Sequence, residues 1–587
     1  MSQKYPLGQN HISTSYSRYI PSTLFQKTWG GSGYDSADAV ALDSAGNIYV
    51  AGRTNSFCCG AFLLKYNSTG NLLWQRVLLN NSTSPYYDSA ASAMAVDSTG
   101  NVYLAGFTDS TSVRGRDVLL ARFDSSGNLV WQEHWGGNES DTGQGVALDR
   151  LGAIYVTGTT SSFSASTNQN VFVLKLRANG SLIWQKIWGD LIWGSGSGIS
   201  VDSSSNLYVS GYYGYSPNNP TDALLLKLNS TGSLLWQERW NLGNQNSYFS
   251  SIIANAVATD SAGNAYITGT SNYNINGVYY PGIAIMKFNP DGTIAWQRVW
   301  VRSVNYCCQQ TQNGNSLALD RTGDIYVTGQ AGYYPSETTP MGFLILELSP
   351  RGDLEWQGTT AADDRDAGKS LTVDSSGDAV AVGDIYEAPP SNLPSLNVRL
   401  LTGNFTLQTI TGQLTPTNTT VSPLNMINST PIGLQTYSDQ GDAYLLKLQP
   451  PIPSPPSPPL AFVAQAGQNN ISLSWAPPQY TGGHPLTGYN IYKGLSAGGE
   501  TLLASTSTAR AYVDSNAKVG VSYYYYVKAV NSLGESDASN ENYATVGASV
   551  GVTIPINSTI LGGASVLVLA VVGFVVYQRR KRTLHFG

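Results

Sequence analysis

Apolar and polar residues alternate in short runs along most of the chain, and glycine-containing turns separate the runs. In residues 96–137, an alternating run at 102–105 follows an Asp-Ser-x-Gly turn at 97–100. A second alternating run at 118–121 precedes another such turn at 124–127. Alternation with a period of two, interrupted by Gly and Asp, is typical of strands joined by tight turns. This stretch therefore predicts one four-stranded antiparallel sheet.

The same unit recurs along the first three quarters of the chain. The first turn begins at Asp43, Asp97, Asp149, Asp202, Asp260, Asp320 and Asp374. A period near fifty residues with four strands per unit predicts a β-propeller, because each repeat supplies one blade.

Each unit ends in a Trp-Gln pair or a close variant. These tryptophans are Trp74, Trp131, Trp184, Trp236, Trp296 and Trp356, and in four copies a second one follows four residues later, at Trp135, Trp188, Trp240 and Trp300. Residues four apart on a strand share a face. We expect the pairs to pack between neighbouring blades as part of the core.

The alternation of D-S-x-G-N-x-Y-V-x-G with L-x-K-x-x-x-x-G-x-L-x-W-Q resembles the SBBP β-propeller repeat family over roughly residues 24–448. The resemblance implies the propeller architecture. It does not imply a function, because propellers carry many unrelated activities.

The two ends of the repeat region are complementary fragments of one unit. Residues 24–29 match a last strand, and residues 442–448 match a third strand followed by proline. We expect the first to complete the blade of the second, which removes two sheet edges. Residues 397–410 fit a degenerate third and fourth strand, so we predict eight blades in residues 24–449, or seven if this stretch is an insertion.

The remaining regions predict a leader, a linker and a second domain. We expect residues 1–23 to form a disordered leader, and the proline-rich residues 450–459 predict an extended spacer. Residues 460–547 resemble a fibronectin type III β-sandwich, with Trp475 as the core tryptophan and Tyr523 as the corner tyrosine.

A membrane anchor is predicted after a connector at residues 548–559. Residues 560–577 contain no charged side chain and are long enough for a membrane-spanning helix. The basic tail at 578–587 predicts a cytoplasmic C-terminus and an extracellular propeller and sandwich at the cell membrane. Residues 1–19 contain no signal-peptide run, which suggests either a start upstream of Met1 or late insertion of the helix.

Composition excludes several classes of partner. Charged residues make up 12% of the chain and the net charge is −6, so no basic surface for nucleic acid is expected. The cysteines form two adjacent pairs, Cys58 with Cys59 and Cys307 with Cys308, which predict vicinal disulfides or free thiols instead of a zinc site. We expect no metal and no cofactor.

Four features of the sequence suggest chemistry, and for each a simpler interpretation is favoured. The repeated turn aspartates could bind calcium, but each belongs to a different blade, so bonding within its own turn is the better explanation. Residues 351–353, Arg-Gly-Asp, stand where other repeats have hairpin turns. His134 lies on a predicted outer strand, and Asp363, Asp364 and Asp366 form an acidic loop without an assignable catalytic partner.

Tyrosines concentrate in the expected loops between second and third strands and between blades. With the surrounding Ser, Asn and Gly they resemble the composition of antibody loops, and they predict a binding face. The candidate ligand-binding residues are Tyr86, Tyr87, Tyr212, Tyr213, Tyr248, Tyr279, Tyr280, Tyr333 and Tyr334.

We therefore predict a non-catalytic, membrane-anchored recognition or adhesion protein that binds an extracellular protein or glycan. The alternatives are an extracellular enzyme, carbohydrate-active or similar to quinoprotein oxidoreductases, and a purely structural envelope component. Asn-x-Ser/Thr sequons make it a candidate glycoprotein. They begin at Asn67, Asn80, Asn81, Asn138, Asn179, Asn229, Asn404, Asn418, Asn428, Asn470 and Asn557.

Overall fold

The computed structural model describes most of residues 21–546, and every regular element in this part of the chain is a strand. Outside the description lie 1–20, 57–59, 79–88, 110–114, 164–167, 190–192, 215–220, 242–250, 276–277, 303–311, 332–341, 360–365, 387–397, 402–405, 409–413, 416–441, 451–453, 468, 479–480, 483, 485, 508 and 547–587. The all-β prediction is confirmed, and the chain divides near Ser454 into two compact units.

The first unit contains seven repeated sheets in its described residues, each an antiparallel meander of four strands. The first three are β2 (Asp35–Leu42), β3 (Ile48–Thr54), β4 (Gly60–Tyr66) and β5 (Leu72–Leu78); β6 (Ser89–Val96), β7 (Val102–Asp109), β8 (Arg116–Phe123) and β9 (Leu129–Trp135); and β10 (Asp141–Leu148), β11 (Ile154–Thr160), β12 (Asn170–Leu176) and β13 (Leu182–Trp188).

The next three sheets follow the same order. They are β14 (Trp193–Val201), β15 (Leu207–Gly214), β16 (Thr221–Leu228) and β17 (Leu234–Asn241); β18 (Ser251–Thr259), β19 (Ala265–Ile275), β20 (Val278–Phe288) and β21 (Ile294–Arg302); and β22 (Gln312–Leu319), β23 (Ile325–Ala331), β24 (Phe343–Leu348) and β25 (Leu354–Thr359). We call these sheets blades 1 to 6 in chain order.

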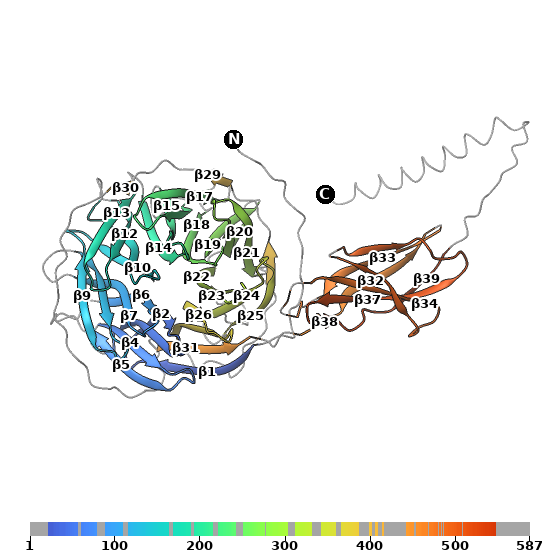
Figure 1. Cartoon of the computed structure of the whole chain (residues 1–587), viewed down its shortest axis with the longest axis horizontal. Helices are drawn as coiled ribbons and strands as arrows, with labels where there is room; N and C mark the ends of the chain where they lie inside the picture. The colour runs from blue at the N-terminus through green and yellow to red at the C-terminus, as the bar shows by residue number, and fades with distance from the viewer. Residues whose placement is uncertain are drawn as a thin grey trace, which may run out of the picture. The chain divides into compact units, whose positions relative to one another are not determined.

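Blade 7 is assembled from both ends of the repeat region. It contains β26 (Ala367–Val373), β27 (Ala379–Ile385), β31 (Asp442–Gln449) and β1 (Ser22–Trp29), with β1 antiparallel to β31. The predicted split blade is therefore confirmed. Figure 1 shows the first strand of each blade near the centre of a ring, and consecutive first strands contact one another all the way round, including β26 with β2.

The prediction of an eighth blade is wrong. The strands β28 (Val398–Leu401), β29 (Thr406–Gln408) and β30 (Leu414–Thr415) pair instead with the outer strands of blades 5, 4 and 3. The ring already closes with seven blades, and this segment lacks the Asp-x-x-Gly and Trp-Gln signals of a repeat. Its short strands therefore satisfy the backbone groups on exposed sheet edges.

The tryptophan prediction holds, and the structure adds a role for the glutamine. Trp135 is 1% exposed and packs with Phe172 of the next blade. Its indole Nε1 donates to Gln185 Oε1 at 2.8 Å, also in the next blade. Trp188 makes the equivalent bond to Gln237. The Trp-Gln motif thus joins adjacent blades by a buried hydrogen bond as well as by packing.

The second unit is a two-sheet sandwich. One sheet contains β32 (Pro459–Ala466), β33 (Ile471–Pro478) and β36 (Ala511–Asp514), and the other contains β34 (Gly488–Gly494), β35 (Thr501–Thr506), β37 (Ser522–Asn531), β38 (Gly534–Glu535) and β39 (Asn542–Thr545). Trp475 lies in the core between the sheets, and the Tyr523 hydroxyl accepts from Lys518 N at 3.3 Å. Both expected residues therefore have their fibronectin-like positions.

The predicted membrane anchor, residues 560–577, lies outside the described part of the chain. Within the described residues no helix is long and apolar enough to span a bilayer.

Candidate functional site

Every blade carries a β-bulge at the same position of its innermost strand. In blade 3 the pairing of β10 with β11 shifts between Gly143 and Gly145, which leaves Gln144 as the bulged residue. A bulge bends the strand and re-aims one side chain, and bulges occur often beside binding sites. The seven bulged residues are Asp38, Ser92, Gln144, Ser197, Asn255, Asn315 and Lys369.

All seven bulged residues are polar, and several bond to the next blade. Asn255 Nδ2 donates to Gly314 O at 2.9 Å, and Asn315 Nδ2 donates to Gly368 O at 2.8 Å. Because the first strands surround the centre of the ring, the seven bulged residues form a ring of polar residues there, which we call the bulge ring.

The glycine of each second strand makes the bulge possible. A Cβ at Gly158 of β11 would overlap the carbonyl oxygen of Thr142, two residues before the bulge, and the glycines at the equivalent positions of the other blades meet the same obstacle. This explains why the Y-V-x-G motif ends in glycine, since any side chain would displace the first strand.

The charged part of the bulge ring lies where blade 7 meets blade 1. Lys369 Nζ lies 3.0 Å from Asp38 Oδ1 and 2.8 Å from Asp384 Oδ2. Burial opposes the charge on Lys369, but the carboxylates of Asp38 and Asp384 outweigh burial and raise the pKa of Lys369. The lysine stays charged and is paired across the seam, so this sector stabilises closure.

The uncharged part of the bulge ring borders a pocket of about 540 Å³ that spans blades 3, 4 and 5. This volume lies within the range of about 300–1,000 Å³ that is usual for small-molecule sites. Hydroxyl and amide side chains dominate its wall. The lining residues are Thr142, Gln144, Thr159, Gln169, Ser195, Ser197, Tyr212, Ile253 and Asn255.

A chain of hydrogen bonds orders one wall of the pocket. The hydroxyls of Thr159 and Ser195 lie 2.6 Å apart, and Ser195 Oγ donates to Gln144 Oε1 at 3.0 Å. Burial raises the pKa of Tyr212, and a hydrogen bond with Ser195 offsets part of that effect. The wall therefore presents fixed, uncharged donors and acceptors.

The pocket lies on the face for which the tyrosine loops were predicted, but the structure describes few of those tyrosines. Tyr212 lines the pocket. Tyr213 is 5% exposed and packs on Trp188 with ring centroids 5.3 Å apart, so it belongs to the core and is no exposed loop residue. Tyr279 and Tyr280 lie in strand β20, because the hairpin of β19 and β20 extends further than predicted.

The other candidates from the sequence lie outside the described residues. They are Tyr86, Tyr87, Tyr248, Tyr333, Tyr334 and the four cysteines Cys58, Cys59, Cys307 and Cys308. The sequence alone does not single out Gln144, Ser197 and Asn255, because their only signal is a polar residue at one fixed position of a strand that otherwise contains mainly small residues.

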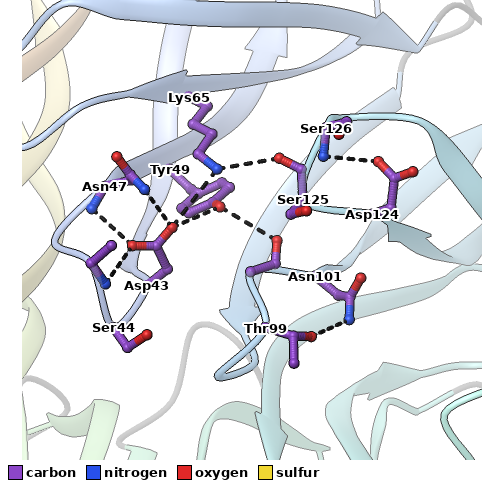
Figure 2. Close-up of polar contacts among 12 residues, drawn as sticks. Asp43, Ser44, Asn47, Tyr49, Lys65, Thr99, Asn101, Asp124, Ser125 and Ser126 are labelled. Atoms are coloured by element: carbon purple, nitrogen blue, oxygen red, sulfur yellow. Dashed lines mark hydrogen bonds and ion pairs between the residues drawn. The ribbon is translucent and has the colours of Figure 1, made fainter.

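The opposite face of the ring contains the Asp-x-x-Gly turns, and these bond to themselves as predicted. Asp43 Oδ1 accepts from the backbone N–H of Ala45 and Asn47 at 3.0 and 2.9 Å (Figure 2). Burial alone would raise the pKa of Asp43, but these bonds and those from the Asn47 and Tyr49 side chains lower it. Each carboxylate is used within its own blade, and no group of acids that could hold a metal ion occurs among the described residues.

The same face tethers adjacent blades. Lys65 Nζ donates to Ser125 O of blade 2 at 3.2 Å (Figure 2). Lys175 makes the equivalent bond to Ser230 O of blade 4 at 3.0 Å. The Arg351-Gly352-Asp353 segment is one of these hairpin turns, in which Gly352 N donates to Ser349 O at 2.8 Å and φ of Gly352 is +78°. Its predicted role as a turn is confirmed.

The two remaining catalytic candidates have structural environments. His134 lies on the outer strand β9, where its Nε2 is buried without a hydrogen-bond partner among the described residues. Asp366 is fully buried immediately before β26 and accepts from Tyr386 N at 2.9 Å. Asp363 and Asp364 lie outside the described residues.

Comparisons with known proteins agree with both units. The fibronectin type III domain model matches residues 454–545, and the β-propeller repeat model SBBP matches residues 28–57, 135–163 and 245–276. The chain thus contains SBBP repeats and a fibronectin type III domain. Together they suggest an extracellular binding or structural role.

Individual relatives cover only short parts of the chain. A 91-residue stretch is 37% identical to an amylopullulanase of Thermoanaerobacterium saccharolyticum, which is 15% of this chain and 7% of that protein. A fibronectin-like protein from Clostridium thermocellum is 29% identical over 15% of this chain and 92% of its own, with a TM-score of 0.14. A human fibronectin type III domain is 27% identical over 17% and 94%, with a TM-score of 0.15.

Proposed function

We propose that this protein is an extracellular recognition protein, anchored to the cell membrane by residues 560–577, whose propeller binds an external ligand at the pocket of blades 3 to 5. The fibronectin type III domain serves as a spacer between the anchor and the propeller. The observation that carries the proposal is the pocket itself, formed by bulged residues of three consecutive blades.

The chemistry of the pocket favours binding over catalysis. General acid–base catalysis needs a group whose pKa lies near the working pH. The described lining residues include one titratable side chain, Tyr212, and burial raises its pKa away from neutrality. Hydroxyls and amides are suited to recognising a ligand by hydrogen bonds.

A structural envelope component is the second candidate. The tethers between blades on the turn face, such as Lys65 to Ser125, would serve a rigid structural module equally well. Such a module needs no pocket residue for its role, and this difference separates the two candidates.

The proposal is tested by comparing variants on the two faces. The purified full-length protein is applied to protein and glycan arrays and to intact cells, together with Tyr212→Ser and the turn-face control Asn128→Ser. We expect Tyr212→Ser to lose at least tenfold in apparent affinity, since a binding aromatic contributes about 2 kcal/mol, while Asn128→Ser binds normally. Equal binding by all three proteins, or loss in the turn-face variant alone, would contradict the proposal.

A further inference from the structure

We infer that the pocket of blades 3 to 5 binds a neutral saccharide. The inference rests on the proposed function and specifies its ligand. It starts from the charges around the bulge ring, because its two charged members, Asp38 of blade 1 and Lys369 of blade 7, form an ion pair with each other. The five bulged residues between them, on blades 2 to 6, are uncharged.

The lining of the pocket selects against ionic ligands. Among the described residues that line it there is no lysine, arginine, aspartate or glutamate. A sulfated, phosphorylated or sialylated group would lose its hydration there without gaining an opposite charge, which is unfavourable. An apolar ligand would leave many hydroxyls and amides without partners, so a neutral ligand with many hydroxyl groups fits best.

The amides supply the pairing that sugar hydroxyls need. Gln144 uses its Oε1 to accept from Ser195, so its Nε2 remains as a donor. Asn255 uses its Nδ2 to donate to Gly314 O, so its Oδ1 remains as an acceptor. A hydroxyl group both donates and accepts. Neighbouring hydroxyls of a pyranose can therefore engage donor and acceptor amides together with the Ser197 and Thr142 hydroxyls.

The pocket also offers a less polar surface for the C–H face of a sugar ring. Tyr212 and Ile253 come from blades 4 and 5 and contribute an aromatic ring and an aliphatic side chain to the lining. An aromatic side chain combines stiff contact area with a polar tip, which suits a ligand that has both C–H and hydroxyl faces.

The closeness of the first strands argues against a peptide added as an extra strand. A Cβ at Gly145 would lie 3.1 Å from Ile199 N, and one at Gly198 would lie 3.1 Å from Ala256 Cα. The first strands of blades 3, 4 and 5 are thus packed against one another. Little room remains between them for the backbone of a peptide.

The test measures saturation-transfer difference NMR and titration calorimetry on the full-length protein with lactose, maltose, cellobiose and diacetylchitobiose. The matched anionic probe is sialyllactose. We expect saturation transfer to at least one neutral disaccharide. Sialyllactose should bind more weakly than lactose or not at all. Absence of transfer from all four neutral disaccharides, or preferential binding of sialyllactose, would overturn the inference.

Two matched variants separate recognition from folding. Asn255→Leu and Asn315→Leu each remove one bond from a bulged residue to the next blade, of 2.9 and 2.8 Å, but only Asn255 lines the pocket. We expect Asn255→Leu to weaken saccharide binding at least tenfold and Asn315→Leu to change it less than twofold. An equal effect of both variants would assign Asn255 a structural role and refute the site.

The array experiment keeps this inference distinct from the proposed function. If Tyr212→Ser abolishes attachment to a protein ligand while no saccharide binds, the recognition role stands and the saccharide assignment fails. If neither Tyr212→Ser nor Asn255→Leu affects any binding, the proposed function and the saccharide assignment both fail.

Discussion

At the residue scale, the glycine that ends each Y-V-x-G motif is explained by its contact with the first strand. Gly158 lies against the Thr142 carbonyl, where a Cβ would overlap it. Gly152, in the turn of the same blade, has φ of +79° and no atom within 4 Å of its Cβ position. The two glycines are therefore needed for different reasons: Gly158 because there is no room for a Cβ, and Gly152 because its backbone has a positive φ.

Substitution of these two glycines should separate the purposes. We expect Gly158→Ala to lower the free energy of unfolding by about 2–4 kcal/mol, because the bulged strand must shift. Gly152→Asn should cost less than about 1 kcal/mol, because asparagine tolerates positive φ. Urea denaturation of both variants measures the difference. Equal costs would show that the close approach to Thr142 relaxes without penalty.

His134 gives a prediction about pH. Burial lowers the pKa of His134 to about 4, whereas an unfolded chain has a value near 6.5. As pH falls from 6.5 towards 4, the unfolded chain takes up the proton first, so acidification favours unfolding. We expect a contribution of about 2 kcal/mol to be lost between pH 7.5 and pH 5.

The variant His134→Leu isolates this contribution from other titrating groups. It should lose about 2 kcal/mol less stability than the parent over the same pH interval, as measured by urea denaturation at both values. Parallel losses in parent and variant would mean that His134 is protonated as easily in the folded state.

At the element scale, closure of the ring depends on strands from opposite ends of the repeat region. β1 pairs with β31 along its length, and Trp29 is 3% exposed beside Phe62 of blade 1. Without β1 the edge of β31 and the apolar surface around Phe62 would face solvent. Such an edge is a template for aggregation.

Two truncations test the role of β1. Deletion of residues 1–20 leaves β1 intact and should change the melting temperature little. Deletion of residues 1–31 removes the strand and should lower the melting temperature by about 10 °C or more, with increased light scattering on heating. If both truncated proteins melt at the same temperature, the last blade does not need its fourth strand.

At the scale of the whole molecule, the proposed location assigns the propeller and the fibronectin type III domain to the cell exterior. Protease added to intact cells should remove both domains and leave a membrane fragment containing the basic tail, because the positive-inside rule keeps residues 578–587 in the cytoplasm. Immunoblotting with antibodies against the propeller and the tail measures this. Protection of the propeller would contradict the proposed location.

The candidate site could be predicted only in part from the sequence. The sequence predicted a binding face at the loops between second and third strands, from the tyrosines in those loops, and the pocket lies on that side of the ring; that this face binds a ligand stays a prediction. It assigned the site to exposed tyrosines, yet Tyr213 is in the core and Gln144 and Asn255 line the pocket. Bulge register is a property of two paired strands, so no single strand reveals which residue a bulge re-aims.

The sequence by itself determined the local structure of this protein. A two-residue period, an Asp-x-x-Gly turn and a repeat near fifty residues specify strands, hairpins and blades, because these depend on neighbours along the chain. Complementary fragments at the ends also specified the split blade.

Only the tertiary structure decided the rest. The number of blades follows from closure, at which β26 meets β2, and the insertion of β28 to β30 then pairs with outer edges. The bond from Trp135 to Gln185 joins residues 50 positions apart, and the pocket takes residues from three blades. These features depend on which distant segments pack together, and local periodicity carries no information about the packing of segments so far apart.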